Sequence, residues 1–142
     1  MATDERLIFL LSRAHHCLRT YMKQAFEREG LGVTPVQSGI LFLLQHEART
    51  MTALSRELSI DNSAITGLVD RLEIAGLAVR RPHPRDRRTY LVEITDMGRS
   101  AAAKALDLVH TVNAEISAGF SEDEMVVFKR VVNSFFTKFT KE

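Results

Sequence analysis

Apolar residues recur at three- and four-residue steps along most of the chain, which is the spacing of one face of an α-helix. Residues 5–29 predict a long first helix, because no Pro or Gly interrupts this spacing before Gly30. A second helix over residues 35–45 is apolar nearly all round, so we expect it to be central and buried. Thr34 and Gln37 supply the two halves of a capping box at its start.

Two shorter helices are predicted in the next part of the chain. Thr52 is expected to cap a third helix over residues 53–59. Asp61 or Asn62 then caps a fourth helix, which Gly76 ends in the left-handed conformation. The apolar residues of this fourth helix form a narrow stripe that faces the core, made of Ile65, Leu68, Val69 and Leu72.

Residues 77–81 and 90–94 are the two convincing strands, and the second places Tyr90, Val92 and Ile94 on one face and Leu91 and Glu93 on the other. Pro82 and Pro84 lie between them and cannot continue a β-ladder, so a stiff loop is predicted there. Helices follow from Thr95 to about residue 118 and from the capping box that starts at Ser121. The predicted order is α-α-α-α-β-β-α-α, a mainly α single domain with a small β-hairpin.

The charge pattern singles out the hairpin. The chain is nearly balanced, with 19 basic and 18 acidic residues, so the protein as a whole is not a basic surface. Five arginines nevertheless lie in residues 80–88, where Asp86 is the one acidic residue. A helix beside a basic hairpin suits double-stranded DNA, which offers a groove to the helix and phosphates to the hairpin. An arginine-rich turn alone is usually a solvated surface, but the preceding helix-turn-helix pattern favours DNA contact.

Side chains suited to DNA lie on the fourth helix and at the hairpin tip. The hydroxyls of Ser63 and Thr66 can meet base edges or phosphates, and Asn62 and Arg71 suit phosphates. Asp70 has to tilt away from DNA or neutralise a neighbouring arginine. At the tip, three arginines can serve one phosphate backbone or one minor groove, namely Arg85, Arg87 and Arg88. Between them, Asp86 is expected to orient one guanidinium through a bidentate pair.

Over essentially its whole length the chain resembles the MarR family of winged-helix transcriptional regulators. The resemblance is carried by LGVTPVQ at 31–37, LSIDNSAIT at 58–66, LVDRLE at 68–73 with Gly76-Leu77, and DRR at 86–88 followed by LVEIT at 91–95. It implies a winged helix-turn-helix over residues 34–96. It also implies a homodimer that is joined through residues 1–30 and 97–142 and binds a pseudo-palindromic operator.

Functional residues follow from the resemblance position by position. The implied recognition-helix contacts are Asn62, Ser63, Ala64, Thr66 and Arg71. Arg88 matches the wing-tip residue that reaches the minor groove, and Asp86 matches its orienting partner. Gly67 lies where many relatives have an arginine. We therefore expect fewer side chains of this helix to contact bases and the wing to contribute relatively more to DNA binding.

The C-terminal helix independently favours a dimer. Five of the eight phenylalanines lie between Phe120 and Phe139, more than a domain of this size can bury. The expected dimerisation residues of the first and last helices are Leu7, Leu11, Phe128, Val132, Phe135 and Phe139.

The trigger for release from DNA has two candidates. The resemblance implies a small, often phenolic, anionic ligand, for which the candidate pocket residues are His15, His16, Arg19 and His46, although histidines at such positions are more often ordinary surface residues. The alternative is redox sensing through Cys17, the one thiol, but the cysteine of peroxide-sensing relatives falls near Leu10. Zinc-responsive relatives have a Glu-His pair where this chain has Gln37-Ser38, so neither metal nor cofactor is expected.

Other classes of protein fit less well. The chain lacks the nucleotide-binding, zinc-protease and serine-hydrolase motifs, so an enzyme is not expected. The apolar run at residues 7–11 is too short for a signal peptide or a membrane span, and a cytoplasmic protein with no membrane partner is predicted. The function predicted is a sequence-specific DNA-binding transcriptional regulator, a repressor rather than an activator. The alternative class is a protein-interaction module without DNA specificity, which Gly67 and the balanced charge would suit.

Overall fold

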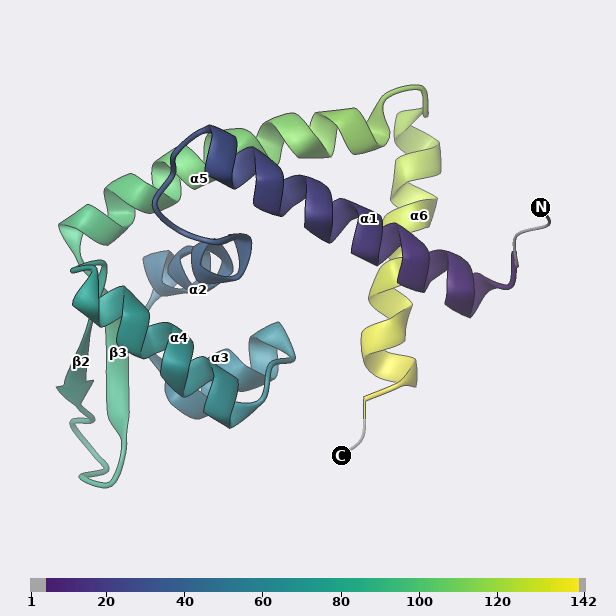
Figure 1. Cartoon of the computed structure of the whole chain (residues 1–142). Coiled ribbons are helices and arrows are strands. Elements are labelled where there is room, and N and C mark those ends of the chain that lie inside the picture. The colour runs from purple at the N-terminus through teal and green to yellow at the C-terminus, as the bar shows by residue number, and fades with distance from the viewer. Residues whose placement is uncertain (1–4, 141–142) are drawn as a thin grey trace. The chain divides into compact units, whose positions relative to one another are not determined.

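A computed structural model describes residues 5–140 of the chain. In this described part the eight predicted elements are present in the predicted order, together with one additional strand. Their bounds are α1 Leu7–Arg28, α2 Pro35–His46, β1 Arg49–Thr50, α3 Met51–Leu58, α4 Asn62–Ile74, β2 Ala78–Pro82, β3 Tyr90–Ile94, α5 Asp96–Ser117 and α6 Glu122–Lys138 (Figure 1). The predicted fold class, a mainly α winged helix-turn-helix, is confirmed. The chain divides into two compact units after Leu108, within α5.

The first unit has its core where α2, α3, α4 and the sheet meet. The predicted burial of α2 is confirmed, because Ile40 and Leu41 are completely buried. The stripe on α4 is also confirmed, although Leu68 is only half-buried while its other members are buried. Packing this stripe inward leaves the opposite face of α4 exposed beside the β2–β3 hairpin (Figure 1).

The sheet has one strand more than predicted. Its three strands have the order β1-β3-β2, all antiparallel, and Arg49 of β1 lies opposite Val92 of β3. This strand moves the start of α3. Thr50, not Thr52, is the N-cap, and its Oγ1 accepts a hydrogen bond from the backbone N–H of Ala53 at 3.1 Å. Pairing with β3 holds Thr50 extended, which is the backbone conformation that an N-cap requires.

The proline prediction for the hairpin is half wrong. Pro82 ends β2 and lies opposite Tyr90, so it belongs to the ladder rather than to the loop. Strand β2 is an edge strand, and proline is tolerated at such an edge because it removes a donor that needs no partner. Pro84 lies outside the strands, as predicted.

The predicted helix ends are largely confirmed. Both capping boxes form, at Thr34 with Gln37 and at Ser121 with Glu124. Gly76 follows α4 with φ +77°, the left-handed conformation. Asp61 is the N-cap residue of α4, but its side chain makes no capping hydrogen bond.

The second unit contains the end of α5 and all of α6. Among the described residues of α6 none is fully buried, and its valines and phenylalanines are exposed or half-buried. No helix in the described part of the chain combines the length and the apolarity needed to cross a membrane.

Candidate nucleic-acid interface

The outer face of α4 carries the predicted recognition residues. Asn62, Ser63, Ala64, Thr66 and Arg71 are all exposed there, as the inward stripe requires. The Thr66 hydroxyl donates a hydrogen bond of 3.0 Å to the backbone oxygen of Asn62, so its lone pairs remain to accept from a base or a bound water. This face is therefore small and polar, with Arg71 as its cation.

Two of the five hairpin arginines are engaged with carboxylates at the base of the wing, the β2–β3 hairpin with its connecting loop. Arg80 lies 2.7 Å from Asp70 of α4 and also pairs with Glu73, as expected for Asp70 if it neutralises a neighbouring arginine. Arg81 pairs across the hairpin with Glu93 at 2.7 Å. Of the five hairpin arginines, the three at the tip are therefore the ones available to bind DNA.

At the wing tip, Asp86 holds Arg88. One carboxylate oxygen, Oδ1, accepts hydrogen bonds from the backbone N–H of Arg88 at 3.0 Å and from its Nε at 3.3 Å. The predicted bidentate pair is wrong, because the two residues are only two positions apart and a single oxygen serves both donors. The side chain of Arg88 is 90% exposed, so both Nη groups still face solvent. No carboxylate among residues 5–140 is shown pairing with Arg85 or Arg87.

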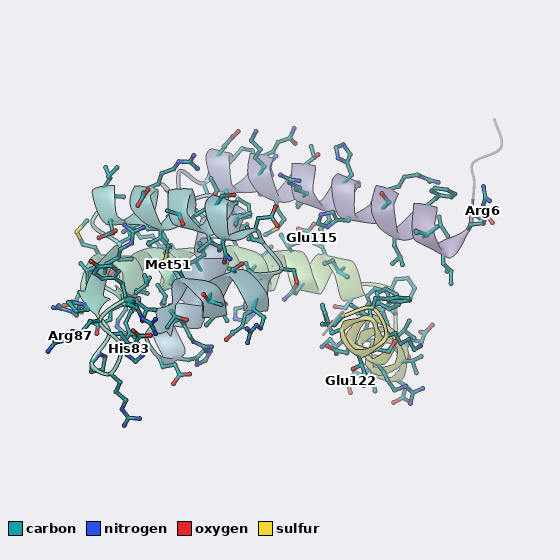
Figure 2. All side chains as sticks on the ribbon, turned by 90° about the horizontal axis from the view of Figure 1, so that it is seen from below. Arg6, Met51, His83, Arg87, Glu115 and Glu122 are labelled. Carbon is teal, nitrogen blue, oxygen red and sulfur yellow. The ribbon has the colours of Figure 1, made fainter. Side chains whose placement is uncertain are left out.

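His83 shapes this tip, a role that was not predicted from the sequence. Its Nδ1 accepts hydrogen bonds from the backbone N–H groups of Arg85 at 3.0 Å and Asp86 at 3.2 Å. The backbone N–H of His83 donates to the backbone oxygen of Thr89 at 3.1 Å, which closes the loop. Figure 2 shows His83 and Arg87 together at the hairpin. A side-chain acceptor two and three residues before the N–H groups it binds is the signal of such a turn, although it is usually read for Asn, Asp, Ser and Thr.

The candidate trigger residues lie at the surface. His15, His16 and Arg19 of α1 and His46 at the end of α2 are all exposed. Cys17 of α1 is exposed too, so burial does not protect its thiol in a single chain.

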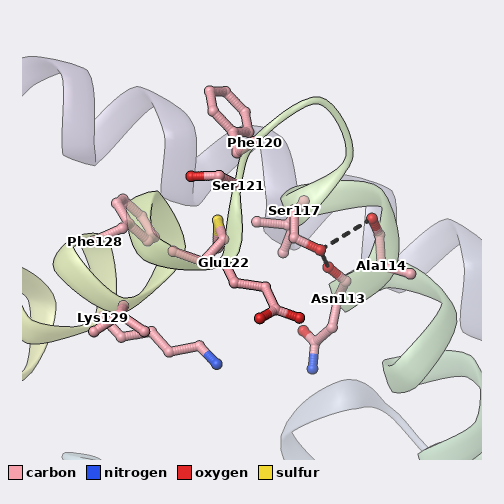
Figure 3. Close-up of a pocket in the computed structure, with 11 residues that line it drawn as sticks. Asn113, Ala114, Ser117, Phe120, Ser121, Glu122, Phe128 and Lys129 are labelled. Atoms are coloured by element: carbon pink, nitrogen blue, oxygen red, sulfur yellow. Dashed lines mark hydrogen bonds between the residues drawn. The ribbon is translucent and has the colours of Figure 1, made fainter.

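A pocket lies in the second unit, at the turn from α5 to α6, where no site was predicted (Figure 3). It measures about 690 Å³, and its lining is mostly apolar. Glu122 and Lys129 add one charge of each sign, beside Phe120 and Phe128.

The expected dimerisation residues are largely exposed in the single chain. Leu7 and Leu11 of α1 are 77% and 39% exposed. On α6, Phe128 and Phe139 are exposed, whereas Val132 and Phe135 are half-buried. The helix exposes further apolar side chains that the prediction did not include, namely Val126, Val127, Val131 and Phe136.

Comparison with known proteins agrees with this geometry. A model of the MarR family matches residues 31–89, from the loop before α2 through the wing tip. The multiple antibiotic resistance protein MarR of Escherichia coli is 30% identical over 101 residues, which are 70% of either chain. The organic hydroperoxide resistance transcriptional regulator of Bacillus subtilis is 27% identical over 113 residues, covering 79% of this chain and 76% of the relative.

Solved structures extend the similarity to nearly the whole chain. The transcriptional repressor CouR bound to a 23-mer DNA duplex superposes with a TM-score of 0.83 at 27% identity, covering 92% of each chain. CouR from Rhodococcus jostii RHA1 bound to p-coumaroyl-CoA superposes with a TM-score of 0.82 at 26% identity, covering 100% of this chain and 98% of that one.

Proposed function

Because the chain belongs to the MarR family of DNA-binding transcriptional regulators, we propose that it is a repressor that binds a pseudo-palindromic operator as a homodimer. Residues 34–96 supply the winged helix-turn-helix, and residues 1–30 and 97–142 join the two copies. The exposed face of α4 enters the major groove of each half-site, and the wing tip reaches the flanking minor groove.

The observation that carries this proposal is the construction of the wing tip. Arg85, Arg87 and Arg88 project from one short loop, and Asp86 holds the backbone and Nε of Arg88 while its Nη groups face outward. The bond from Asp86 to the backbone of Arg88 is an Asx-turn, which solvated loops also use, but the bond to Nε also sets the direction of the guanidinium. A narrow minor groove has an enhanced negative potential that attracts an inserted arginine, and an arginine already held in one direction loses less conformational freedom on entering it.

The exposed apolar faces of α1 and α6 support the proposed homodimer. Leu7 and Phe139 are more than three-quarters exposed, and soluble chains rarely leave many such side chains in water. A two-fold interface also supplies two recognition helices, and consecutive major grooves on one side of DNA lie about 34 Å apart. The dimer therefore matches the symmetry of a palindromic operator.

For the trigger, we propose a small anionic ligand that favours a state with lower affinity for DNA. CouR is a repressor that has been observed both on DNA and with an acyl-CoA, which supports the idea for this chain. His15, His16, Arg19 and His46 are the candidate ligand residues, because their side chains can donate hydrogen bonds to a carboxylate or phenolate. Binding of the ligand then lowers the affinity for DNA, and binding of DNA lowers the affinity for the ligand by the same factor.

Oxidation of Cys17 is the alternative trigger. The exposure of this thiol and the similarity to a hydroperoxide-resistance regulator favour it. Peroxide that leaves DNA affinity unchanged, or that acts equally on Cys17→Ser, contradicts this alternative.

The proposal is tested by enriching duplexes from a random-sequence pool with the purified protein and then titrating the enriched duplex and a scrambled one. We expect one palindromic sequence to be enriched, and affinity for it to fall steeply with salt as phosphate contacts are screened. Arg88→Ala should weaken binding, whereas Lys23→Ala, which removes an exposed cation of α1, should leave it nearly unchanged. A pool without enrichment, or equal affinity for both duplexes, refutes a sequence-specific regulator and favours the protein-interaction alternative.

A further inference from the structure

An ion-pair cluster at the base of the wing connects α4 to β2. The guanidinium of Arg80 places Nη2 2.7 Å from Oδ1 of Asp70, and its Nη1 donates to Oε1 of Glu73. The second oxygen of Glu73 accepts from the backbone N–H of Arg80 at 3.3 Å. Asp70 and Glu73 lie three positions apart on α4, so they are neighbours on one face of the helix. One residue of β2 is thus held to α4 by both its side chain and its backbone.

This cluster is better suited than an ordinary surface ion pair to fix the position of β2 against α4. The side chains of Arg80 and Glu73 are 25% and 31% exposed, and fully exposed pairs contribute little because water and salt screen them. Arg80 lies opposite Val92, which is completely buried, so the cluster covers the edge of the core. A guanidinium is planar and rigid, and two carboxylates bound to it fix its direction.

We propose that Arg80 is a positioning residue for DNA recognition, which fixes the wing against α4 so that Arg88 meets the minor groove when α4 occupies the major groove. This inference rests on the proposed contact of Arg88 with DNA. Arg80 itself brings no surplus charge, because two carboxylates surround its single positive charge. Its single positive charge offsets one of the two negative charges that Asp70 and Glu73 place on α4 near the phosphates.

The neighbouring arginine provides a matched control. Arg81 follows Arg80 on β2 and pairs with Glu93 of β3. Successive residues of a strand point to opposite faces, so Arg81 points away from the face that Arg80 shares with Ala78. Its ion pair lies wholly within the hairpin and cannot set the angle between the hairpin and α4. Arg81→Ala removes the same charge from an adjacent position.

The test is a double-mutant cycle on the duplex enriched by the wild-type protein. We expect Arg88→Ala to weaken binding by roughly five- to a hundredfold, the range for losing one good groove contact. Arg80→Ala should weaken binding of the wild type by at least about fivefold but of the Arg88→Ala variant by less than about twofold, since it acts through Arg88. Arg81→Ala should have a small effect that is equal in both backgrounds.

The outcomes separate this inference from the proposed function. If the factors for Arg80→Ala and Arg88→Ala multiply, Arg80 acts independently of the wing tip and the inference is overturned while the wing contact stands. If Arg88→Ala has no effect, the wing contact fails and the inference fails with it.

Two further variants keep the test decisive if Arg80→Ala lowers the melting temperature. Asp70→Asn changes the half-exposed helix partner with little change in shape, and it should repeat the dependence on Arg88. Arg80→Lys keeps the charge but loses the planar fork, so it should weaken binding, whereas a direct phosphate contact would tolerate lysine. Hydroxyl-radical footprints of both variants should lose minor-groove protection before major-groove protection, and a footprint that fades evenly contradicts the positioning role.

Discussion

A single substitution, glycine to alanine, is expected to act in opposite directions at two helical positions of this protein. Gly98 lies in the first turn of α5, where its N–H donates to Oγ1 of the capping Thr95 at 3.0 Å. A Cβ at this position would lie 2.7 Å from Cγ1 of Ile94 and within 3.0 Å of the backbone oxygen of Leu77, closer than real Cβ atoms approach. Gly67 lies in the middle of α4, and a Cβ there would have no heavy atom within 4 Å.

The local contacts decide whether alanine raises or lowers the stability of the fold at each position. Alanine favours a helix interior over glycine by about 0.5–1 kcal/mol, and this gain applies fully at Gly67. At Gly98 the same gain is opposed by overpacking, which costs about 1–3 kcal/mol in a close-packed site and more where backbone has to move. The Leu77 oxygen cannot withdraw easily, because it accepts the N–H of Thr95 at 3.1 Å. We therefore expect a net loss at Gly98 and a net gain at Gly67.

Thermal or urea unfolding, followed by circular dichroism, measures the difference. Protein concentration must be the same for all variants, because the stability of the proposed dimer would depend on it. For a chain of this size each kcal/mol shifts the melting temperature by about 2–4 °C. Gly98→Ala should melt several degrees below wild type and Gly67→Ala slightly above it. A Gly98→Ala variant as stable as wild type would show that α5 does not approach Leu77 as closely as described.

Three further predictions concern DNA binding and assembly. Gly67→Arg should strengthen binding to the enriched duplex, and the slope of log K against log salt concentration should become steeper by about 0.9 for each added phosphate contact. An unchanged slope in a salt titration would contradict a position of residue 67 that faces the groove. His83→Ala should weaken DNA binding because the backbone N–H groups of the tip lose their shared acceptor, while His83→Asn, which supplies a side-chain oxygen, should retain most of it; equal losses in a binding titration contradict the acceptor role. Phe128→Asp should shift the protein from dimer to monomer in equilibrium sedimentation, because an unpaired carboxylate is costly to bury; a dimer that persists unchanged places the interface elsewhere.

Local signals in the sequence determined most of the helices and their ends. A capping box needs only residues three positions apart, so Thr34 with Gln37 and Ser121 with Glu124 could be identified without knowing the fold. The same holds for Gly76, whose left-handed φ ends α4. Strand β3 was predictable because every second residue, Tyr90, Val92 and Ile94, forms one apolar face. The exposed face of α4 and the arginines of the tip followed from these elements.

Tertiary structure alone decided the features that depend on a partner distant in sequence. Strand β1 has two residues, too few for any periodicity, and it exists because Arg49 and Thr50 pair with β3. That pairing extended Thr50 and made it the cap of α3. The sequence gives Arg80 no partner, and the turn after α4 at Gly76 brings it back against Asp70 and Glu73. An ion pair has no sequence signature when its members lie on different elements, because its geometry is set by the packing of those elements. The sequence by itself therefore determined which wing residues carry charge, and only the packing of β2 against α4 decided which of those charges stay available for DNA.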